Sequence, residues 1–528
     1  MVVAANSWRT GDVVPASMGA RSHRCDDFGD VFGTTGKLTM RSLTVNLLQS
    51  ALRVPDRVAV RSDDTVLTYA QLEERTGRVA TMLCAEGVTP GSRVALMLPN
   101  VPEFVVLYYG ILRAGCVVVP MNPLLKAREV AYYLSDCGAR VLFDWRGGPG
   151  EGPQGAAASG TIVRTIDPTS FAALLARHAP RHDSPEVELD QVAVILYTSG
   201  TTGQPKGAAL TLAGLAHNAE VYASTVQELH HDDVILGCLP LFHTFGQTCA
   251  LNAAIYSGAA LTLVPRFEPA AVFEAIARDR VTVFAGVPTM YSALLRDAGA
   301  TTADVRSLRR CVSGGASLPV ELLTAFEKTF GCEILEGYGL SETSPVVTFN
   351  HAGRPRKPGS IGVPIRDVEV ELVDVIDGIG EIAVRGPNVM SGYWNRPEAT
   401  EAAIPDGWFR TGDLARRDDD GYYYIVDRKK DMIIRGGYNI YPREIEELLY
   451  EHPDVVQAAV FGIADDHLGE EIVAAIVLSA EANTTAEELQ RFVRERIAAY
   501  KYPRHVWLLD ELPTGPSGKI LKRAITRP

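Results

Sequence analysis

Short apolar runs alternate with longer amphipathic segments along much of this chain, beginning near residue 94. The pattern predicts strands at 94–98, 116–119 and 140–143, with helices at 101–113 and 126–135 between them. The alternation returns with a strand predicted at Val192–Leu196 and continues past residue 340. Strands that alternate with helices form parallel sheets, which bind ligands beyond the carboxyl ends of their strands. We therefore expect an α/β fold.

Two segments break this alternation. Residues 145–160 are rich in glycine, alanine and proline, and we expect a surface loop there. A charged junction, Asp427–Lys430, follows a strand predicted at 421–426. Beyond it the pattern predicts α+β structure, with a helix at 444–450, strands at 455–463 and 472–478, and a helix at 486–499. That length of chain is enough for a separate small domain.

The charge balance narrows the class of ligand. The 528 residues carry a formal net charge of −13, with 46% hydrophobic and 22% charged residues. The composition is typical of a globular protein, and an acidic chain argues against a nucleic-acid partner. A polyanionic ligand would have to be held by local cations and backbone dipoles, because the overall field repels it.

The cysteines and the hydropathy of the chain indicate in which cellular compartment the protein is expected. The eight cysteines are scattered without a C-x-x-C pair, which favours buried free thiols in a reducing, cytoplasmic environment. No apolar run is long enough to span a membrane as a helix. Residues 1–39 mix arginine with aspartate and lack an apolar core, so we expect a disordered extension, with Met40 as an alternative start.

The most informative segment is Tyr197–Gly207, YTSGTTGQPKG, which follows a predicted strand. Glycines let backbone N–H groups approach an anion, hydroxyl groups donate further hydrogen bonds, and a lysine supplies positive charge. The segment therefore predicts a phosphate-binding loop that uses Thr198, Ser199, Gly200, Thr201, Thr202, Gly203 and Lys206. It is not a Walker A loop, because Gly207 stands where that motif has the serine or threonine that holds magnesium.

Six further motifs follow this loop along the chain. They are LPLFHTFG (239–246), SGGA (313–316), EGYGLSET (336–343), WFRTGDL (408–414), DRKK (427–430) and PTGPSGK (513–519). Together with the loop they resemble the adenylate-forming superfamily, which includes acyl-CoA synthetases, peptide-synthetase adenylation domains and luciferases. The resemblance covers the chain from about residue 40 to the C-terminus. Residues 385–394, 427–434 and 437–446 are most similar to the fatty-acid–CoA ligase branch.

The resemblance implies an α/β fold in two domains. The large N-terminal domain, residues 40–427, would consist of α/β subdomains, with parallel sheets flanked by helices and a small β-barrel-like part. Residues 428–430 would form a hinge, and residues 431–528 a small mobile α+β domain. One segment departs from the family: residues 373–381 are shorter than the hairpin of relatives, and we expect only a trimmed loop there.

The implied reaction has two half-reactions. The carboxylate of a fatty acid attacks the α-phosphorus of ATP to give acyl-AMP and pyrophosphate, and coenzyme A then displaces AMP to give acyl-CoA. By the resemblance, the phosphate loop would hold the departing phosphates and Ser341 would contact the α-phosphate. Glu342, together with Thr198, would bind Mg²⁺, a hard cation that prefers oxygen ligands. ATP, Mg²⁺ and coenzyme A are thus the implied cofactors.

The resemblance also assigns a nucleoside site. Tyr338 would stack on the adenine, and Asp413 would accept the ribose hydroxyls with assistance from Arg428. The other residues expected around the adenine are Gly314, Gly315, Ala316, Glu336, Gly337 and Gly339.

The remaining assignments concern catalysis and the acyl group. Lys519 would bring an ammonium group to the charge that develops between carboxylate and α-phosphate, and His243 would separate the nucleotide and acyl sites. Rotation at Lys430 would carry Gly436 and Gly437 toward the pantetheine arm of coenzyme A. An apolar acyl pocket would be lined by Phe245, Met290, Gly314, Gly337, Pro345 and Val346.

Several alternatives stay open at this point. The acyl group could pass to an acyl carrier protein, as in fatty-acyl-AMP ligases, or the acid could be aromatic. A peptide-synthetase adenylation domain, a P-loop kinase or ATPase, and a non-catalytic nucleotide-binding protein fit the motifs less well. Transient association with a membrane surface would suit a lipid-handling enzyme, but no amphipathic anchor stands out. The oligomeric state is also open.

Overall fold

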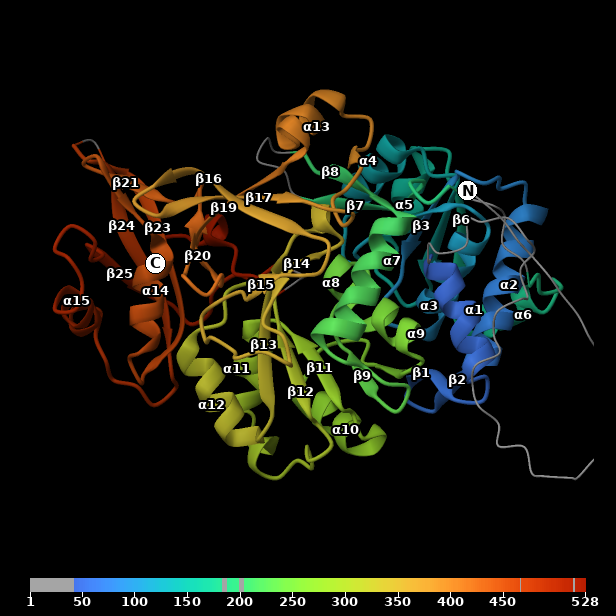
Figure 1. Cartoon of the computed structure of the whole chain (residues 1–528), viewed down its shortest axis with the longest axis horizontal. Coiled ribbons are helices and arrows are strands. Elements are labelled where there is room, and N and C mark those ends of the chain that lie inside the picture. Colours follow the sequence, from blue (N-terminus) through green and yellow to red (C-terminus); the bar gives the residue numbers. More distant parts are fainter. Residues whose placement is uncertain (1–41, 183–187, 199–203, 466, 516–517) are drawn as a thin grey trace, which may run out of the picture. The chain divides into compact units, whose positions relative to one another are not determined.

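The computed structural model describes residues 42–182, 188–198, 204–465, 467–515 and 518–528 (Figure 1). Across these residues, sheets and helices alternate in the mixed α/β manner that the sequence predicts. Residues 1–41, which contain the expected N-terminal extension, and Ser199–Gly203 of the phosphate loop lie outside the described residues.

The largest sheet in the described chain has nine strands, in the order β15-β14-β13-β12-β11-β9-β10-β1-β2. Its central strands are parallel, whereas β2, β14 and β15 join the edges antiparallel. Helices α10 (Pro269–Asp279), α11 (Pro288–Arg296) and α12 (Val320–Phe330) lie beside it (Figure 1). The strands are β1 (Val58–Ser62), β2 (Thr65–Thr68), β9 (Val234–Gly237), β10 (Ala260–Leu263), β11 (Val283–Gly286), β12 (Arg310–Ser313), β13 (Glu333–Gly339), β14 (Val346–Phe349) and β15 (Val363–Pro364).

A second sheet has seven strands among the described residues, in the order β18-β8-β7-β4-β3-β5-β6. It confirms the strands and helices predicted between residues 94 and 143, and its β7 follows the prediction at Val192–Leu196. Strands β7 and β8 are antiparallel, so the phosphate loop joins two neighbouring strands. The elements are β3 (Arg93–Met97), α3 (Pro102–Arg113), β4 (Val117–Pro120), α4 (Ala127–Cys137), β5 (Val141–Trp145), β6 (Ile162–Ile166), β7 (Val192–Thr198), β8 (Lys206–Thr211) and β18 (Gly392–Tyr393).

The surface loop expected at residues 145–160 is wrong, because Glu151–Ala157 forms helix α5. Two of the glycines that suggested a loop, Gly152 and Gly155, are required by close packing. A Cβ atom at Gly155 would lie 2.6 Å from the backbone oxygen of Ala127 and 2.6 Å from the Cβ of Val130 on α4. The small residues therefore let α5 approach α4, and this tertiary contact outweighs their low intrinsic helix preference.

Two smaller sheets follow toward the C-terminus. The small β-barrel-like part expected from the sequence is an antiparallel sheet of β16 (Glu369–Ile376), β17 (Ile379–Arg385), β19 (Phe409–Arg417) and β20 (Tyr423–Arg428). The shortened segment 373–381 forms a tight turn between β16 and β17, in which Asp377 and Gly378 have φ angles of +51° and +79°. Two such residues with positive φ match the twist of the flanking strands.

The last sheet confirms the α+β pattern predicted beyond the charged junction. It contains β21 (Ile433–Arg435), β22 (Tyr438–Ile440), β23 (Val455–Asp465), β24 (Gly469–Leu478) and β25 (His505–Leu508), with helices α14 (Pro442–Tyr450) and α15 (Ala486–Arg494). Helix α15 ends at Arg494, five residues before the predicted end at Ala499. The chain turns back there, and the backbone N–H of Arg504 donates to the oxygen of Ile472 directly before β25.

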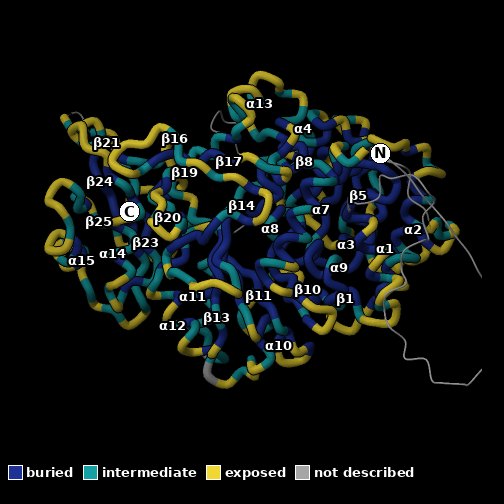
Figure 2. Tube along the Cα trace, viewed as in Figure 1, coloured by how far each residue is buried: buried dark blue, intermediate teal, exposed yellow. Residues whose placement is uncertain are grey.

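The main core extends from the first helices through the nine-stranded sheet and along one face of the seven-stranded sheet (Figure 2). The other face of the seven-stranded sheet packs against α4 and α5 in a separate cluster. Helix α3 is buried along its whole length.

Among the described cysteines, Cys84 is exposed and the others are buried, all as free thiols. In the described residues no helix is both long and apolar enough to cross a membrane. The other helices are α1 (Leu43–Arg53), α2 (Tyr69–Ala85), α6 (Pro168–Leu175), α7 (Leu212–Val221), α8 (Thr244–Gly246), α9 (Ala253–Ser257) and α13 (Pro397–Ala403).

Candidate active site

The two ends of the phosphate loop are held opposite each other. Thr198, at the end of β7, pairs in register with Lys206, at the start of β8. Thr198 Oγ1 donates a hydrogen bond of 3.0 Å to Glu342 Oε1. The structure thus joins the loop to the EGYGLSET motif more than a hundred residues away. The predicted contacts of Ser199–Gly203 cannot be placed, since those residues lie outside the described chain.

Ser341 and Glu342 lie in a short 3₁₀ turn, Ser341–Thr343, which follows β13. Glu342 is 8% exposed, and its Oε1 also accepts a hydrogen bond of 3.1 Å from the hydroxyl of Tyr393. A carboxylate and a hydroxyl fit Mg²⁺, which takes oxygen ligands. Within the described residues no group of three or more His, Cys, Asp or Glu side chains could hold a metal. A magnesium ion here would take its remaining ligands from nucleotide phosphates and water, as is usual for this ion.

Tyr338, Asp413 and Arg428 form one polar cluster. Tyr338 on β13 donates from its hydroxyl to Asp413 Oδ2 at 2.6 Å, and Arg428 Nε lies 3.2 Å from Asp413 Oδ1. Asp413 and Arg428 are partners in register on β19 and β20. Burial, and then the Asp413 charge, raise the pKa of Tyr338 well above its ordinary value. The cluster therefore joins a flat aromatic ring, a carboxylate and a cation, which suits a nucleoside.

Glu381, which belongs to none of the motifs, supports the turn before Asp413. Its Oε1 accepts from the backbone N–H of Gly412 at 2.9 Å, and its Oε2 lies 3.0 Å from the ammonium of Lys429. One buried carboxylate thus connects the turn before Asp413 with the charged junction at Lys429. No local signal identifies Glu381, because the contact depends on the pairing of β17 with β19.

The glycines of the predicted adenine wall have different structural roles. Gly315 has a φ of +80°, a conformation that favours glycine, and it is followed by Ala316. At Gly337 a Cβ atom would lie 2.1 Å from the Phe349 ring, and at Gly339 one would lie 1.8 Å from the Pro345 oxygen. Packing against Phe349 and Pro345 therefore explains Gly337 and Gly339 without any ligand.

Glu336, the first residue of the EGYGLSET motif, is almost completely buried, with 2% of its surface exposed. Its Oε1 accepts from the backbone N–H of Leu318 at 3.0 Å, while Oε2 has no partner among the described residues. Burial raises the pKa of Glu336 to about 7, against the opposing effect of the Arg443 charge. Its predicted contact with the nucleotide stays a prediction.

Lys519 reaches this region from the C-terminal end of the chain. Its loop is docked by Thr289, whose Oγ1 donates to the oxygen of Gly518 at 3.1 Å. A Cβ atom at Gly315 would lie 3.8 Å from Lys519 Cε. Burial, and then the charge of Arg428, lower the pKa of the Lys519 ammonium to about 8, while Asp413 and Glu342 act in the opposite direction. The structure thus places the predicted catalytic lysine beside the predicted nucleotide site.

His243 caps the short helix α8, where its Nδ1 accepts from the backbone N–H of Phe245 at 3.3 Å. Burial, and then the charge of Lys519, lower the pKa of His243 to about 4. The imidazole is therefore neutral near pH 7, and it lies near enough to Lys519 for the ammonium charge to lower its pKa. Its predicted place between the nucleotide and acyl sites stays a prediction.

The other predicted residues of the C-terminal segment lie in turns, with Lys430 next to the cluster and Gly436 and Gly437 in a separate hairpin. Lys430 is exposed in a turn after β20, where the backbone N–H of Asp431 donates to the Arg428 oxygen at 3.0 Å. Gly436 and Gly437 form the turn of the β21–β22 hairpin, and the Gly436 N–H donates to the Leu468 oxygen. The structure therefore does not bring these glycines to the residues gathered around Asp413.

Two family models match the chain. The AMP-binding enzyme model covers residues 47–394, and the model of the AMP-binding enzyme C-terminal domain covers residues 444–519. The matched ranges contain the phosphate loop, the Ser341–Glu342 turn and the Lys519 loop.

Known proteins resemble the chain over nearly its whole length. It is 36% identical to the long-chain-fatty-acid–CoA ligase of Bacillus subtilis (strain 168), with 92% of this chain and 94% of that protein covered. It is 41% identical to a feruloyl-CoA synthase of an Amycolatopsis species, with 90% and 96% covered. Its structure resembles that of the anthranilate CoA ligase AuaEII in complex with anthranoyl-AMP, with a TM-score of 0.87, 29% identity and 91% and 96% coverage. The chain therefore belongs to the AMP-binding enzymes of the adenylate-forming superfamily and is an acid–thiol ligase.

Proposed function

We propose that this protein is a fatty-acid–CoA ligase that forms acyl-AMP and pyrophosphate from a fatty acid and ATP, and then acyl-CoA and AMP. The observation that carries the proposal is the position of Lys519. Its ammonium is electrostatically coupled to Arg428, Asp413 and Glu342, at the end of a loop docked on Thr289. A cation so placed can stabilise charge that develops at the α-phosphate.

Each side chain of the cluster has a distinct part in the adenylation half-reaction. Tyr338 and Asp413 would orient the nucleoside, and Lys206 would neutralise the departing phosphates. Lys519 would hold the incoming carboxylate against the α-phosphate, so that positioning supplies much of the rate. Glu342 and Thr198 would hold Mg²⁺, which when bound supplies positive charge to the phosphates.

The thioester half-reaction requires a different arrangement of the C-terminal segment. We include in the proposal the division of the chain at residues 428–430, with residues 431–528 turning about Lys430. Exposed apolar side chains on the β21–β22 hairpin, Ile434 (52%) and Tyr438 (57%), support a second position for this hairpin. Rotation would carry Gly436 and Gly437 to the site, where they leave room for the pantetheine arm.

The side chains expected around the acyl group are suited to an alkyl chain or a hydrophobic ring. Met290 and Val346 belong to the main hydrophobic core, and Phe245 packs against it. A Cβ atom at Gly314 would lie 3.2 Å from Phe245 Cζ, so the ring lies directly beside Gly314. Such surroundings are suited to apolar groups and would leave the ammonium of an amino acid unpaired.

A second candidate, an aryl-acid–CoA ligase, is favoured by one observation, the 41% identity to a feruloyl-CoA synthase. The two candidates are separated by incubating the protein with ATP, Mg²⁺ and a panel of saturated fatty acids of increasing length, ferulate and benzoate, with and without coenzyme A. Mass spectrometry would detect the products, and Lys519→Ala would serve as the inactive control.

We expect acyl-CoA and AMP, with a higher kcat/KM for a fatty acid than for either aryl acid. Preference for ferulate or benzoate would support the second candidate. Acyl-AMP that accumulates regardless of coenzyme A would instead indicate transfer to an acyl carrier protein. Formation of ADP would contradict adenylation altogether.

A further inference from the structure

We propose that Tyr393 is a positioning residue for the phosphate and metal end of the nucleotide site. Its hydroxyl donates to Glu342 Oε1 at 3.1 Å, and the Lys206 ammonium lies over its ring, 5.2 Å from the ring centroid. One side chain thus contacts both the carboxylate expected to bind Mg²⁺ and the cation expected to bind phosphate. The inference rests on the proposed function, because it assigns Glu342 and Lys206 to the site of ATP.

Backbone pairing fixes the position of Tyr393. Strand β18 pairs antiparallel with β8, and Tyr393 lies opposite Ala208. On one side of this pair, the Trp394 N–H donates to the Gly207 oxygen at 2.7 Å, and on the other the Met390 N–H donates to the Glu342 oxygen at 2.8 Å. The segment from Met390 to Trp394 therefore connects the Glu342 turn to the strand that begins with Lys206.

The hydroxyl contact determines how the Glu342 carboxylate is oriented. Thr198 and Tyr393 both donate to Oε1, and among the described residues Oε2 accepts no hydrogen bond. Two donors on one oxygen fix the plane of the carboxylate and leave the other oxygen for a ligand. Hydrogen bonds that orient a metal-binding carboxylate strengthen metal binding, and their removal typically costs about 10- to 100-fold in affinity or activity.

The ring contact acts on the phosphate loop. An ammonium over an aromatic face is attracted by the ring quadrupole, which restricts the flexible lysine stem. Lys206 is thus held at the mouth of the loop by a neutral partner, and its full charge stays available to a phosphate. A carboxylate in the same position would compete with that phosphate.

The test separates the two contacts. Tyr393→Phe keeps the ring and removes the hydroxyl, whereas Tyr393→Leu removes both. Binding of a non-hydrolysable ATP analogue is measured by calorimetry at stepped Mg²⁺ concentrations, without any acid. We expect Tyr393→Phe to raise the Mg²⁺ concentration for half-maximal binding by about 10- to 100-fold, with most of the binding restored at high Mg²⁺. Tyr393→Leu should weaken analogue binding by about a further 2- to 10-fold at saturating Mg²⁺.

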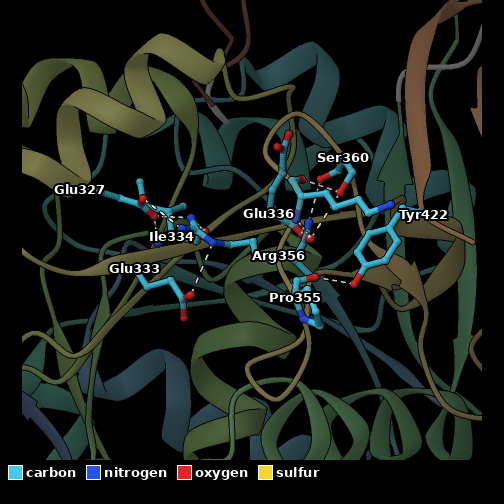
Figure 3. Close-up of polar contacts among 10 residues, drawn as sticks. Glu327, Glu333, Ile334, Glu336, Pro355, Arg356, Ser360 and Tyr422 are labelled. Carbon is cyan, nitrogen blue, oxygen red and sulfur yellow. Dashed lines mark hydrogen bonds and ion pairs between the residues drawn. The ribbon is translucent and has the colours of Figure 1, made fainter. Parts of the chain in front are cut away.

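Tyr422 offers a matched control. Its hydroxyl donates to the Pro355 oxygen (Figure 3). The Lys357 ammonium lies 4.7 Å from its ring centroid. Tyr422→Phe therefore removes a hydroxyl hydrogen bond from another tyrosine whose ring lies under a lysine, but without touching Glu342. We expect it to leave the Mg²⁺ dependence unchanged. In a Glu342→Gln background, Tyr393→Phe should have no additional effect on that dependence.

An unchanged Mg²⁺ dependence in Tyr393→Phe would overturn the inference, as would an equal shift in Tyr422→Phe. A loss of binding that high Mg²⁺ does not restore would also overturn it, since it indicates a structural role only. Failure of the wild-type protein to form acyl-AMP from any acid would refute the proposed function separately, because the binding titration requires no acid.

Discussion

The hydroxyl of Tyr338 donates a hydrogen bond of 2.6 Å to the carboxylate of Asp413, across 75 residues of sequence. The bond joins the end of β13 in the largest sheet to β19 in the four-stranded antiparallel sheet. Since Arg428 neutralises the other oxygen of the same carboxylate, the aromatic ring and the carboxylate proposed to accept the ribose are held in one fixed arrangement. Preorganisation of this kind reduces the entropy lost when a nucleotide binds.

Asp413→Asn should weaken ATP binding. The change removes the charge that accepts from Tyr338 and Arg428, and hydrogen bonds to a charged group contribute about 1.5–3 kcal/mol each. We expect the KM for ATP to rise by at least about 10-fold, while the KM for the acid changes little. Calorimetry with ATP provides the direct check. Tyr338→Phe, which keeps the ring, should have a smaller effect, and unchanged ATP affinity in Asp413→Asn would contradict the assignment.

Lys519→Ala should separate the half-reactions. Removal of the ammonium should slow acyl-AMP formation by at least about 100-fold, the usual cost of losing one charge-stabilising donor. Thioester formation from supplied acyl-AMP and coenzyme A should continue, because Lys519 then has no charge to stabilise. Rapid-quench assays of each half-reaction measure the two rates. Equal loss of both would contradict this division of roles.

Adenylation should also depend on pH through Lys519. Its pKa is lowered to about 8, so the ammonium is present below this pH and lost above it. We therefore expect kcat/KM for ATP to fall as the pH rises through about 8. In the complex with ATP, the negative triphosphate should raise the pKa of Lys519, so kcat should fall only at higher pH. His243, with a pKa of about 4, stays neutral in this range. The other charged groups that act on Lys519 are Arg428, Asp413, Glu342 and Lys430.

The pH profile has an internal control. Lys519→Arg keeps a positive charge throughout the range, so its lower activity should not decline near pH 8. A wild-type profile that is flat from pH 7 to pH 10, or an identical decline in the arginine variant, would show that another group titrates.

Gly518→Ala should impair adenylation through the Lys519 loop. Gly518 has a φ of +76°, and a Cβ atom there would lie 2.8 Å from Val287 Cγ2 and 2.9 Å from Thr289 Oγ1. The loop would have to leave Thr289, which displaces Lys519, so we expect at least about a 10-fold loss in adenylation. Gly407→Ala is the matched control, because Gly407 has a φ of +80° with no atom within 4 Å. Similar losses of adenylation in both variants would indicate backbone strain alone.

Lys430→Pro should affect the opposite half-reaction. Proline fixes φ, so rotation at this position would be restricted. Acyl-AMP should still form, whereas acyl-CoA production should fall by at least about 10-fold. Single-turnover assays with and without coenzyme A measure both steps. Acyl-CoA formed at the wild-type rate would place the hinge elsewhere.

The positions of most helices and strands could be predicted because their signals are local. Residues 94–143 alternate apolar runs with amphipathic segments, and the structure contains β3, α3, β4, α4 and β5 there. Prediction failed at α5, where glycine and alanine indicated a loop. Gly155 belongs to a helix because α4 approaches too closely for a side chain, and that distance is not encoded in the local pattern.

Local motifs were enough to identify residues chemically suited to a nucleotide, because the segments around Thr198, Glu342, Asp413 and Lys519 carry hydroxyl, carboxylate and ammonium groups in the order typical of the family. Which of these groups meet depends on contacts in the folded protein. Pairing of β19 with β20 sets Arg428 beside Asp413, and pairing of β18 with β8 brings Tyr393 to Glu342 and Lys206. Strand register and loop docking arise from contacts between residues far apart in the chain, and a local pattern cannot specify contacts of that kind.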